Sequence, residues 1–255
     1  RIPLVYDSHE YYTGVPELVN RPKVQRFWKR IESYILPRLR YVYTVNESIA
    51  LLYKEEYGID FEFIRNVPEP KRYPPRDRDL LRRDLNLPID KKIVLLQGAG
   101  INIQRGAEEA VQAMQYLENT VLLIVGGGDV MPVLKKLVAE YQLGDKVRFE
   151  GKKAPSDLVL YTESADLGLS LDKDTNLNYR YSLPNKLFDY INAGIPVLAS
   201  NLPEVRKIVE GYDIGRIAES HDPKYLAGLI SEMLSDTAGA TAMKSQLEKA
   251  ASELN

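Results

Sequence analysis

The sequence predicts an α/β protein with doubly wound parallel sheets in two domains. Apolar runs of strand length alternate with amphipathic segments of helix length along the chain, and this repetition is typical of parallel sheets covered by helices. Most of the runs are continuously apolar, as expected for strands that are buried on both faces. A break in composition between residues 66 and 87 indicates where the two domains separate.

The expected elements follow from the length and periodicity of each segment. Apolar runs predict strands at residues 4–7, 41–45, 61–64, 93–97, 121–125, 147–150, 167–171, 197–199 and 214–218. Helical periodicity predicts helices that include residues 22–39, 47–56, 107–117, 131–142, 156–162, 184–192 and 203–209. Pro184 and Pro203 fall in first helical turns, where proline is tolerated, and Gly194 ends the helix that Pro184 opens.

A proline-rich, charged stretch without periodicity, NVPEPKRYPPRDRD, indicates a linker that starts at residue 66. We therefore expect a partial N-terminal domain at residues 1–80 and a C-terminal ligand-binding domain at residues 81–240. Residues 241–255 should begin a helical return segment toward the N-terminal domain. The chain opens directly before a strand and ends within a helical pattern without a cap. We therefore expect a fragment that is truncated at both ends.

The composition argues against several classes of protein. A net charge of −2 gives no support to general nucleic-acid binding, so no nucleic-acid partner is expected. The absence of Cys excludes disulfides and thiolate chemistry and fits a cytoplasmic location. No run approaches the roughly 18 apolar residues that a membrane-spanning helix needs.

The segment SLPNKLFDYINAGIPVLASNLPE, residues 182–204, carries the strongest functional pattern. Lys186 lies in the first turn of the helix that opens at Pro184, and a helix N-terminus beside a cation favours an anion. One turn further, the Asp189 carboxylate can accept hydrogen bonds from sugar hydroxyls. A phosphate site next to a ribose site predicts that a nucleotide binds here.

Glycine-rich turns follow three other expected strands, at the carboxyl ends where open α/β sheets bind ligands. They are QGAG at residues 97–100, GGGD at residues 126–129 and GKK at residues 151–153. The first precedes Arg105, which could clamp a phosphate. Each pattern also fits a tight turn without a ligand.

Three further signals are weaker. Asp172 and Asp174 are separated by a lysine and have no further acidic ligands nearby, so a polar loop is expected there and no metal site. His9 ends the first strand and could exchange a proton with a substrate hydroxyl near neutral pH, or be an incidental loop residue. His221 lies in a helix-start turn and is predicted to be structural.

Residues 21–40 combine basic and apolar side chains at helical spacing. The basic residues are Arg21, Lys23, Arg26, Lys29, Arg30, Arg38 and Arg40. The segment is either a helix whose apolar stripe covers the sheet or a basic face that touches an anionic membrane or acceptor.

In their order and spacing, these motifs make the chain resemble the family-4 (group 1) glycosyltransferases, which have the GT-B fold of two Rossmann-like domains. The matching segments are SLPNKLFDYINAGIPVLAS with LPEV, DSHE, YTVNES, IRNVPE, LLQGAG with RG, LLIVGGGD, VRFEG and SADLGLSL. The resemblance covers most of the chain. It implies that a nucleotide-sugar, such as a UDP- or GDP-sugar, binds mainly to the C-terminal domain and faces a cleft against the N-terminal domain.

The resemblance also implies roles for individual residues. Arg105 corresponds to the basic residue that pairs with the diphosphate, Asp189 to the acid that holds the ribose, and His9 to a residue near the reaction centre. The expected catalytic residues are His9, Arg105 and Lys186. The expected donor-binding residues are Gly98, Gly100, Arg105, Gly126, Gly127, Lys153, Asn185, Lys186, Leu187 and Asp189.

The chain departs from the family pattern at three positions, one of which is Asp189, where a glutamate is usual and reaches one methylene further. Ala99 stands where an arginine is usual, and Lys186 could supply the missing charge. Tyr181 stands where an acid usually contacts the transferred sugar, which leaves the sugar specificity and the full activity open.

The function implied is retaining, metal-independent hexosyl transfer in polysaccharide biosynthesis, without a cofactor, to a carbohydrate or lipid-linked acceptor. We expect a cytoplasmic protein with peripheral contact to the inner membrane face through residues 21–40, and a fragment that binds nucleotide but transfers little sugar. Two alternatives stay open. A sugar-nucleotide epimerase of the same fold would need additional acid/base residues, and a catalytically idle nucleotide-sugar-binding domain would suit Tyr181.

Overall fold

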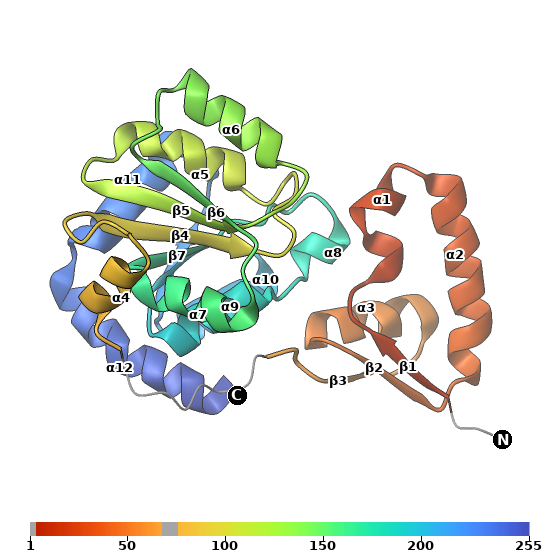
Figure 1. Cartoon of the computed structure of the whole chain (residues 1–255). Coiled ribbons are helices and arrows are strands. Elements are labelled where there is room, and N and C mark those ends of the chain that lie inside the picture. The colour runs from red at the N-terminus through yellow and green to blue at the C-terminus, as the bar shows by residue number, and fades with distance from the viewer. Residues whose placement is uncertain (1–3, 68–75, 255) are drawn as a thin grey trace. The chain divides into compact units, whose positions relative to one another are not determined.

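The computed structural model describes residues 4–67 and 76–254, which form two compact units (Figure 1). The first unit comprises Arg1–Asn66, Asp174–Leu183 and Leu202–Glu204, and the second comprises Val67–Lys173, Pro184–Asn201 and Val205–Asn255. Each unit has its own parallel sheet, so the prediction of two parallel-sheet domains is confirmed. In the described residues, each of the nine expected strands has a counterpart.

In the described residues, the first unit contains a three-stranded sheet in the order β1-β2-β3. Its strands are β1 (Val5–Ser8), β2 (Tyr41–Thr44) and β3 (Glu62–Phe63). Its helices are η1 (Tyr12–Gly14), α1 (Pro16–Val19), α2 (Pro22–Ile35), η2 (Leu36–Arg38), α3 (Glu47–Tyr57) and α8 (Leu177–Arg180). Its core is aromatic: Tyr53 is fully buried and stacks on Phe61 with ring centroids 4.2 Å apart.

Residues 174–183, which carry α8, complete the first unit although they come late in the chain. Asn178 accepts a hydrogen bond from the N–H of Tyr11 at 3.2 Å and donates one to Glu10 at 2.9 Å. Asn46 donates to the backbone oxygen of Tyr181 at 2.8 Å. These polar contacts, together with the packing of Tyr181 on the aromatic core, fix the segment to the first unit.

The second unit contains, in its described residues, a six-stranded parallel sheet in the order β6-β5-β4-β7-β8-β9. Its strands are β4 (Lys92–Gly98), β5 (Thr120–Gly126), β6 (Val147–Gly151), β7 (Leu167–Ser170), β8 (Val197–Ser200) and β9 (Gly215–Ala218). Strands β5, β7 and β8 are buried along their whole length, as their continuous apolar runs predict. The order reverses direction between β4 and β7, which is the point where doubly wound sheets bind ligands.

The helices of the second unit cover both faces of this sheet, and one of them, α10, begins with two residues that cluster with the first unit. These helices are α4 (Arg78–Asp84), α5 (Ala107–Ala113), η3 (Met114–Tyr116), α6 (Met131–Glu140), α7 (Pro155–Ser164), α9 (Asn185–Ala193), α10 (Pro203–Gly211), α11 (Pro223–Ser235) and α12 (Thr237–Leu254). Figure 1 shows α5, α6 and α11 over one face and α4, α7 and α9 over the other.

A buried tyrosine locks α9 onto the sheet at the switch between β4 and β7. The Tyr190 hydroxyl lies 3.3 Å from the backbone oxygen of Leu95 and 3.1 Å from that of Leu169. Its ring packs on Gly168, where an added Cβ would lie 2.5 Å from ring atoms. This packing requires a glycine in β7 and holds the first turn of α9 near the carboxyl ends of the strands.

The expected linker, residues 66–79, ends inside a helix that the sequence did not predict, because residues 78 and 79 open α4 (Arg78–Asp84). Asp77 caps this helix by accepting hydrogen bonds from the N–H groups of Asp79 and Leu80. The helix has only two turns, too few for periodicity to appear in the sequence. A domain boundary at residue 80 would fall inside α4, whereas residues 68–75 of the expected linker lie outside the described residues.

The expected return segment, as far as the structure describes it (residues 241–254), belongs to a longer helix, α12, which starts at Thr237. It packs against α9 and α11 within the second unit. The sequence pattern did identify a helix here, but its start and its packing partners depend on tertiary contacts.

Candidate functional site

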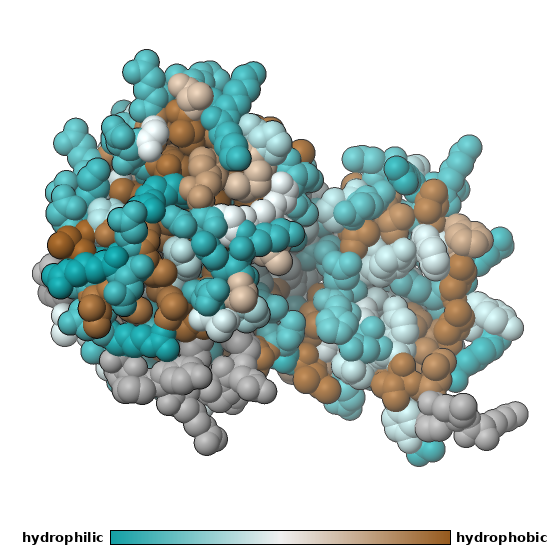
Figure 2. Space-filling model, viewed as in Figure 1, coloured by the Kyte–Doolittle hydropathy of each residue, from teal (hydrophilic) through white to brown (hydrophobic). Residues whose placement is uncertain are grey.

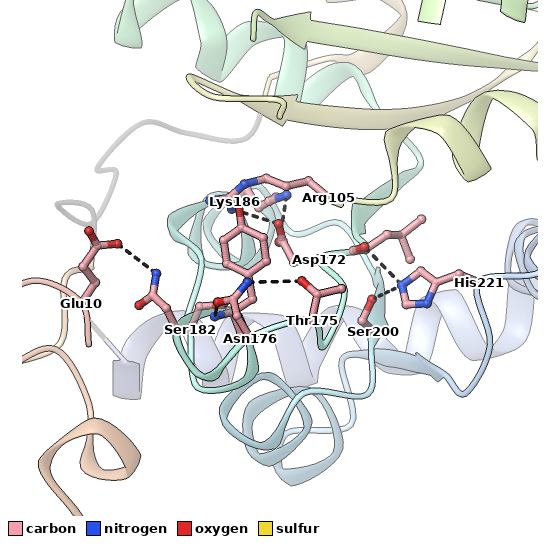
Figure 3. Close-up of polar contacts among 12 residues, drawn as sticks. Glu10, Arg105, Asp172, Thr175, Asn176, Ser182, Lys186, Ser200 and His221 are labelled. Atoms are coloured by element: carbon pink, nitrogen blue, oxygen red, sulfur yellow. Dashed lines mark hydrogen bonds and ion pairs between the residues drawn. The ribbon is translucent and has the colours of Figure 1, made fainter. Parts of the chain in front are cut away.

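A buried carboxylate joins two cations at the carboxyl edge of the second unit's sheet (Figure 3). Asp172 follows β7 and its side chain has no exposed surface. One oxygen, Oδ1, lies 2.9 Å from a guanidinium nitrogen of Arg105, and the other, Oδ2, lies 3.2 Å from the Lys186 ammonium. We call these three residues the Asp172 cluster. Its two cations are the two that the sequence predicted for the diphosphate.

The loop that carries Arg105 is held against the end of β7. Gly106 has a left-handed backbone with φ +72°, and an added Cβ would lie 2.3 Å from the backbone oxygen of Leu171. The N–H of Lys173 donates to the backbone oxygen of Gln104 at 2.9 Å. Only glycine permits this approach at position 106, and the approach brings Arg105 to Asp172.

Helix α9 supplies the second cation from its first turn. Its N-cap residue, Pro184, has no side-chain acceptor, so the first-turn N–H groups of Asn185 and Lys186 receive no side-chain cap from it. Such N–H groups favour an anion, as the helix dipole does. The Lys186 side chain is 10% exposed, so its charge is largely shielded from water.

Asp189 is held in position by a polar relay that the sequence did not reveal. Gln97, which is buried at the end of β4, donates to Asp189 Oδ2 at 2.8 Å. The hydroxyl of Thr162 donates to Gln97 Oε1 at 2.7 Å. A signal was present, because Gln97 is a polar residue at the end of an otherwise apolar strand.

Several of the predicted glycines have a reason within the fold itself. At Gly126 (φ +143°), an added Cβ would lie 1.9 Å from the backbone oxygen of Gly98, so these residues let neighbouring strand ends approach. At Gly127 it would lie 3.1 Å from the Lys152 side chain, and at Gly100 its nearest contact would be 3.5 Å from Asn102. These contacts agree with the turn interpretation, and a role of these glycines at a ligand stays a prediction.

The other residues predicted for this site differ in their surroundings. Lys153 lies over the Tyr161 ring and 3.6 Å from Glu150 Oε2, and its hydrogen bond with Tyr161 raises the pKa of the Lys153 ammonium. Asn185 is exposed. Leu187 is fully buried and its N–H donates to the backbone oxygen of Pro184 at 3.0 Å, so its side chain belongs to the core.

Two residues of interest lie in the first unit. His9 Nε2 is 2.9 Å from Asp7 Oδ2, and the His9 side chain is 69% exposed. Tyr181 packs with the aromatic core of that unit. The structure thus gives Tyr181 a packing role that explains an aromatic residue at this position.

His221 ties three strand ends together beside the cluster. Its Nε2 lies 2.8 Å from the Ser200 hydroxyl and 3.2 Å from the backbone oxygen of Leu171 (Figure 3). Burial lowers the pKa of His221. These contacts support the predicted structural role of His221.

The carboxylates that suggested a metal have other partners. Asp172 faces two cations, and Asp174, in the first unit, lies 3.6 Å from a guanidinium nitrogen of Arg180. Among the described residues, no group of three or more His, Cys, Asp or Glu residues is placed to hold a metal ion. In the same part of the chain, no helix has the length and apolar character needed to cross a membrane.

The fold and the Asp172 cluster define a doubly wound α/β protein with a cationic site at the carboxyl edge of its sheet. The chain belongs to the group 1 glycosyl transferases, because the model of that family matches residues 77–253. The resemblance inferred from the motifs is confirmed at this level.

Individual curated relatives match this chain over less than half of their own length. A D-inositol 3-phosphate glycosyltransferase of Acidothermus cellulolyticus is 27% identical over 194 residues, which cover 70% of this chain and 42% of that protein. The amylovoran biosynthesis glycosyltransferase AmsK of Erwinia amylovora is 24% identical over 164 residues, which cover 64% of this chain and 39% of that protein. The chain therefore spans less than half the length of these curated relatives.

Solved structures show the same fold. Anabaena Alr3699/HepE, in complex with UDP and glucose, matches 98% of this chain and 67% of its own with a TM-score of 0.81 and 19% identity. WaaG, a glycosyltransferase involved in lipopolysaccharide biosynthesis, matches 83% of this chain and 58% of its own with a TM-score of 0.70 and 18% identity. At these identities the likeness concerns the fold.

Proposed function

We propose that this chain is the donor-binding part of a glycosyltransferase that takes a hexosyl group from a nucleoside diphosphate sugar. The observation that carries the proposal is the pair of cations, Arg105 and Lys186, gathered on one buried carboxylate at the ligand-binding edge of the sheet. Family membership and the UDP and glucose held by the Anabaena protein of the same fold support it. No cofactor takes part in the proposed reaction.

The chemistry requires stabilisation of a leaving group. As the bond between the anomeric carbon and the β-phosphate oxygen breaks, negative charge builds on the nucleoside diphosphate. In this proposal, Arg105, Lys186 and the N-terminus of α9 stabilise that charge and no metal ion is needed. By analogy with an oxyanion-hole donor, the loss of one such contact raises the barrier by about 3–4 kcal/mol.

Recognition of the nucleoside is proposed for a neighbouring part of the same edge. Asp189 would accept hydrogen bonds from the ribose hydroxyls, in an orientation that Gln97 fixes. Gly98, Gly100, Gly126 and Gly127 would form the loops around the sugar donor. Lys153 would lie near the base.

The remaining parts of the reaction concern the acceptor. We propose a carbohydrate or lipid-linked acceptor, transfer with retention at the anomeric carbon, and a place in polysaccharide biosynthesis on the cytoplasmic side. His9, at the end of β1 in the first unit, is proposed to act near the reaction centre. Transfer is proposed over epimerisation or simple binding because the curated relatives are named glycosyltransferases.

We further propose that α2 touches an anionic membrane face. Among the described side chains of α2, Glu32 is the buried one. Phe27 is 59% exposed and Tyr34 is 64% exposed, and both lie among the basic residues. Figure 2 shows hydrophobic and hydrophilic residues side by side over α2. Cosedimentation with phosphatidylglycerol vesicles should retain the protein, and Phe27→Ser should weaken that binding. Equal binding to neutral vesicles would contradict this proposal.

A thermal-shift panel tests the donor site. UDP, GDP, ADP and TDP are compared, because the Anabaena protein holds UDP and a Mycobacterium tuberculosis relative is named GDP-mannose-dependent. At a hundredfold excess over Kd, one of them should raise Tm by about 5–10 °C. Lys186→Ala and Arg105→Ala should lose most of this shift, whereas Lys135→Ala on the exposed side of α6 should keep it. No shift with any nucleotide would refute the proposal.

A further inference from the structure

Asp172 is an unexpected residue at a site proposed to bind a diphosphate. A carboxylate repels phosphate, and its charge leaves the Asp172 cluster with a single net positive charge. The side chain has no exposed surface, so it contacts neither solvent nor an incoming ligand. A buried charge is retained only where its partners compensate for the loss of water.

The two cations come from separate parts of the chain, and Asp172 is the group that both contact. Arg105 lies in the loop between β4 and α5, and Lys186 lies in the first turn of α9. Each has a long side chain with many rotamers, and ordering such a side chain costs conformational entropy. Asp172 gives one oxygen atom to each cation and thereby orders both before a ligand arrives.

We propose that Asp172 is a positioning residue for the sugar donor, which holds Arg105 and Lys186 in the arrangement that receives the diphosphate. The inference rests on the proposed function. An Arg guanidinium has five N–H donors and a Lys ammonium has three, so each cation can bond to Asp172 and to a phosphate at once. Asp172 acts through these cations and does not touch the reacting atoms.

The direction in which diphosphate affinity changes on removal of the carboxylate separates this positioning role from a purely electrostatic one. If only net charge mattered, removal of the carboxylate would make the site more positive and would tighten diphosphate binding. If Asp172 positions the cations, its removal weakens diphosphate binding despite the added positive charge. The Asp172→Asn change suits the test, because it keeps the shape and removes the charge, and its amide nitrogen cannot accept a hydrogen bond from either cation.

The experiment is calorimetric titration of wild type, Asp172→Asn and Asp172→Glu with the nucleoside diphosphate that gives the largest thermal shift. The corresponding nucleoside, which lacks the phosphates, is titrated in parallel. We expect Asp172→Asn to weaken diphosphate binding about tenfold or more, the loss of one charge-assisted hydrogen bond. Nucleoside binding should stay unchanged, since general damage to the fold would weaken both. Asp172→Glu, which restores the charge, should recover part of the loss.

The outcomes distinguish a failure of the proposed function from a failure of the positioning role. If wild type binds no nucleoside diphosphate, the proposed function fails. The positioning role is refuted if wild type binds the diphosphate and Asp172→Asn binds it equally or more tightly. It is also refuted if Asp172→Asn loses affinity for the nucleoside as well as for the diphosphate. Melting curves without ligand show whether each variant folds. If neither variant folds, Asp172 serves the fold and the positioning role is also refuted.

Discussion

Two carboxylates at opposite edges of the second unit's sheet, Asp166, which is partly buried, and Asp172, which is fully buried, each pair with two cations, yet their surroundings differ. Asp166 precedes β7 and pairs with Arg78 at 3.1 Å and Arg82 at 2.7 Å. Asp172 follows β7 and pairs with Arg105 and Lys186. The first cluster lies at the amino edge of the sheet and the second at the carboxyl edge.

The amino-edge cluster is completed by the protein itself. All three nitrogens of the Arg82 guanidinium bond to protein oxygens: Nε to Ser164, NH1 to Lys91 and NH2 to Asp166. Asp166 also accepts from the N–H of Ile93 at 2.7 Å. In the described residues, Lys186 has Asp172 as its ion-pair partner, although an ammonium can donate three hydrogen bonds. A carboxylate that pairs with two cations therefore stabilises the fold where backbone groups complete the hydrogen bonds of the cluster, as at the amino edge. It can take part in ligand binding where they do not, as at the carboxyl edge.

The largest expected effect is on stability at the amino edge. Arg82→Ala should lower the free energy of unfolding by about 3 kcal/mol, because it removes the buried guanidinium that bonds to Ser164, Lys91 and the partly buried Asp166. Urea denaturation followed by circular dichroism measures this. Arg83→Ala, on the exposed side of the same helix, should change stability by less than about 0.5 kcal/mol. Equal effects of the two variants would contradict a structural role for the amino-edge cluster.

The next effect is on binding at the carboxyl edge. Lys186→Met should weaken nucleoside diphosphate binding by about 1.5–3 kcal/mol, tenfold or more in Kd, through the loss of a charged hydrogen-bond donor. Its loss of stability should be smaller than that of Arg82→Ala, since Asp172 keeps Arg105. Calorimetric titration and urea denaturation give the two values. If stability falls as far as in Arg82→Ala while Kd stays constant, the two clusters do not differ in role.

A smaller effect is expected from the relay behind Asp189. Gln97→Leu should weaken nucleotide binding by about 1 kcal/mol, because Asp189 loses a hydrogen bond of ordinary strength that orients it. Titration with the nucleoside and its diphosphate should show the same loss for both, since the relay serves the ribose. A loss confined to the diphosphate would assign Gln97 to the cations instead.

The smallest effect concerns pH. Burial lowers the pKa of His221, so the unfolded chain binds its proton more readily than the folded chain does. The contribution of His221 to the free energy of unfolding is therefore fully present above its unfolded pKa of about 6.5. It is lost as the pH drops through 6.5 toward the lower pKa of the folded state. The charged groups near this ring are Glu109, Lys173 and Asp172. Urea denaturation from pH 7.5 to 5 should show less of this decline in His221→Gln, and an identical decline would contradict the assignment.

The sequence predicted the parallel sheets and the two cations because these depend on local patterns. Continuous apolar runs specify β5, β7 and β8, and a helix opening with a lysine in its first turn specifies the position of Lys186. The partner of that lysine could not be predicted. The sequence indicates only a polar loop at Asp172, because no local pattern shows which charge it faces.

Contacts between distant segments account for the rest. In the sequence, Tyr181 is a departure from the family pattern. Its packing role cannot be predicted there, because residues 174–183 join the first unit from a distant part of the chain. Gln97 was visible as a polar residue in an apolar strand, yet its partners, Thr162 and Asp189, lie 65 and 92 residues away. Helix α4 was missed because its two turns are shorter than the periodicity that reveals a helix.

The most direct test of the central claim is a crystal structure of this chain with the nucleoside diphosphate that gives the largest thermal shift. We expect diphosphate oxygens within hydrogen-bond distance of both Arg105 and Lys186, while both cations still contact Asp172. A diphosphate bound elsewhere, or a site in which Arg105 and Lys186 have left Asp172, would contradict the account.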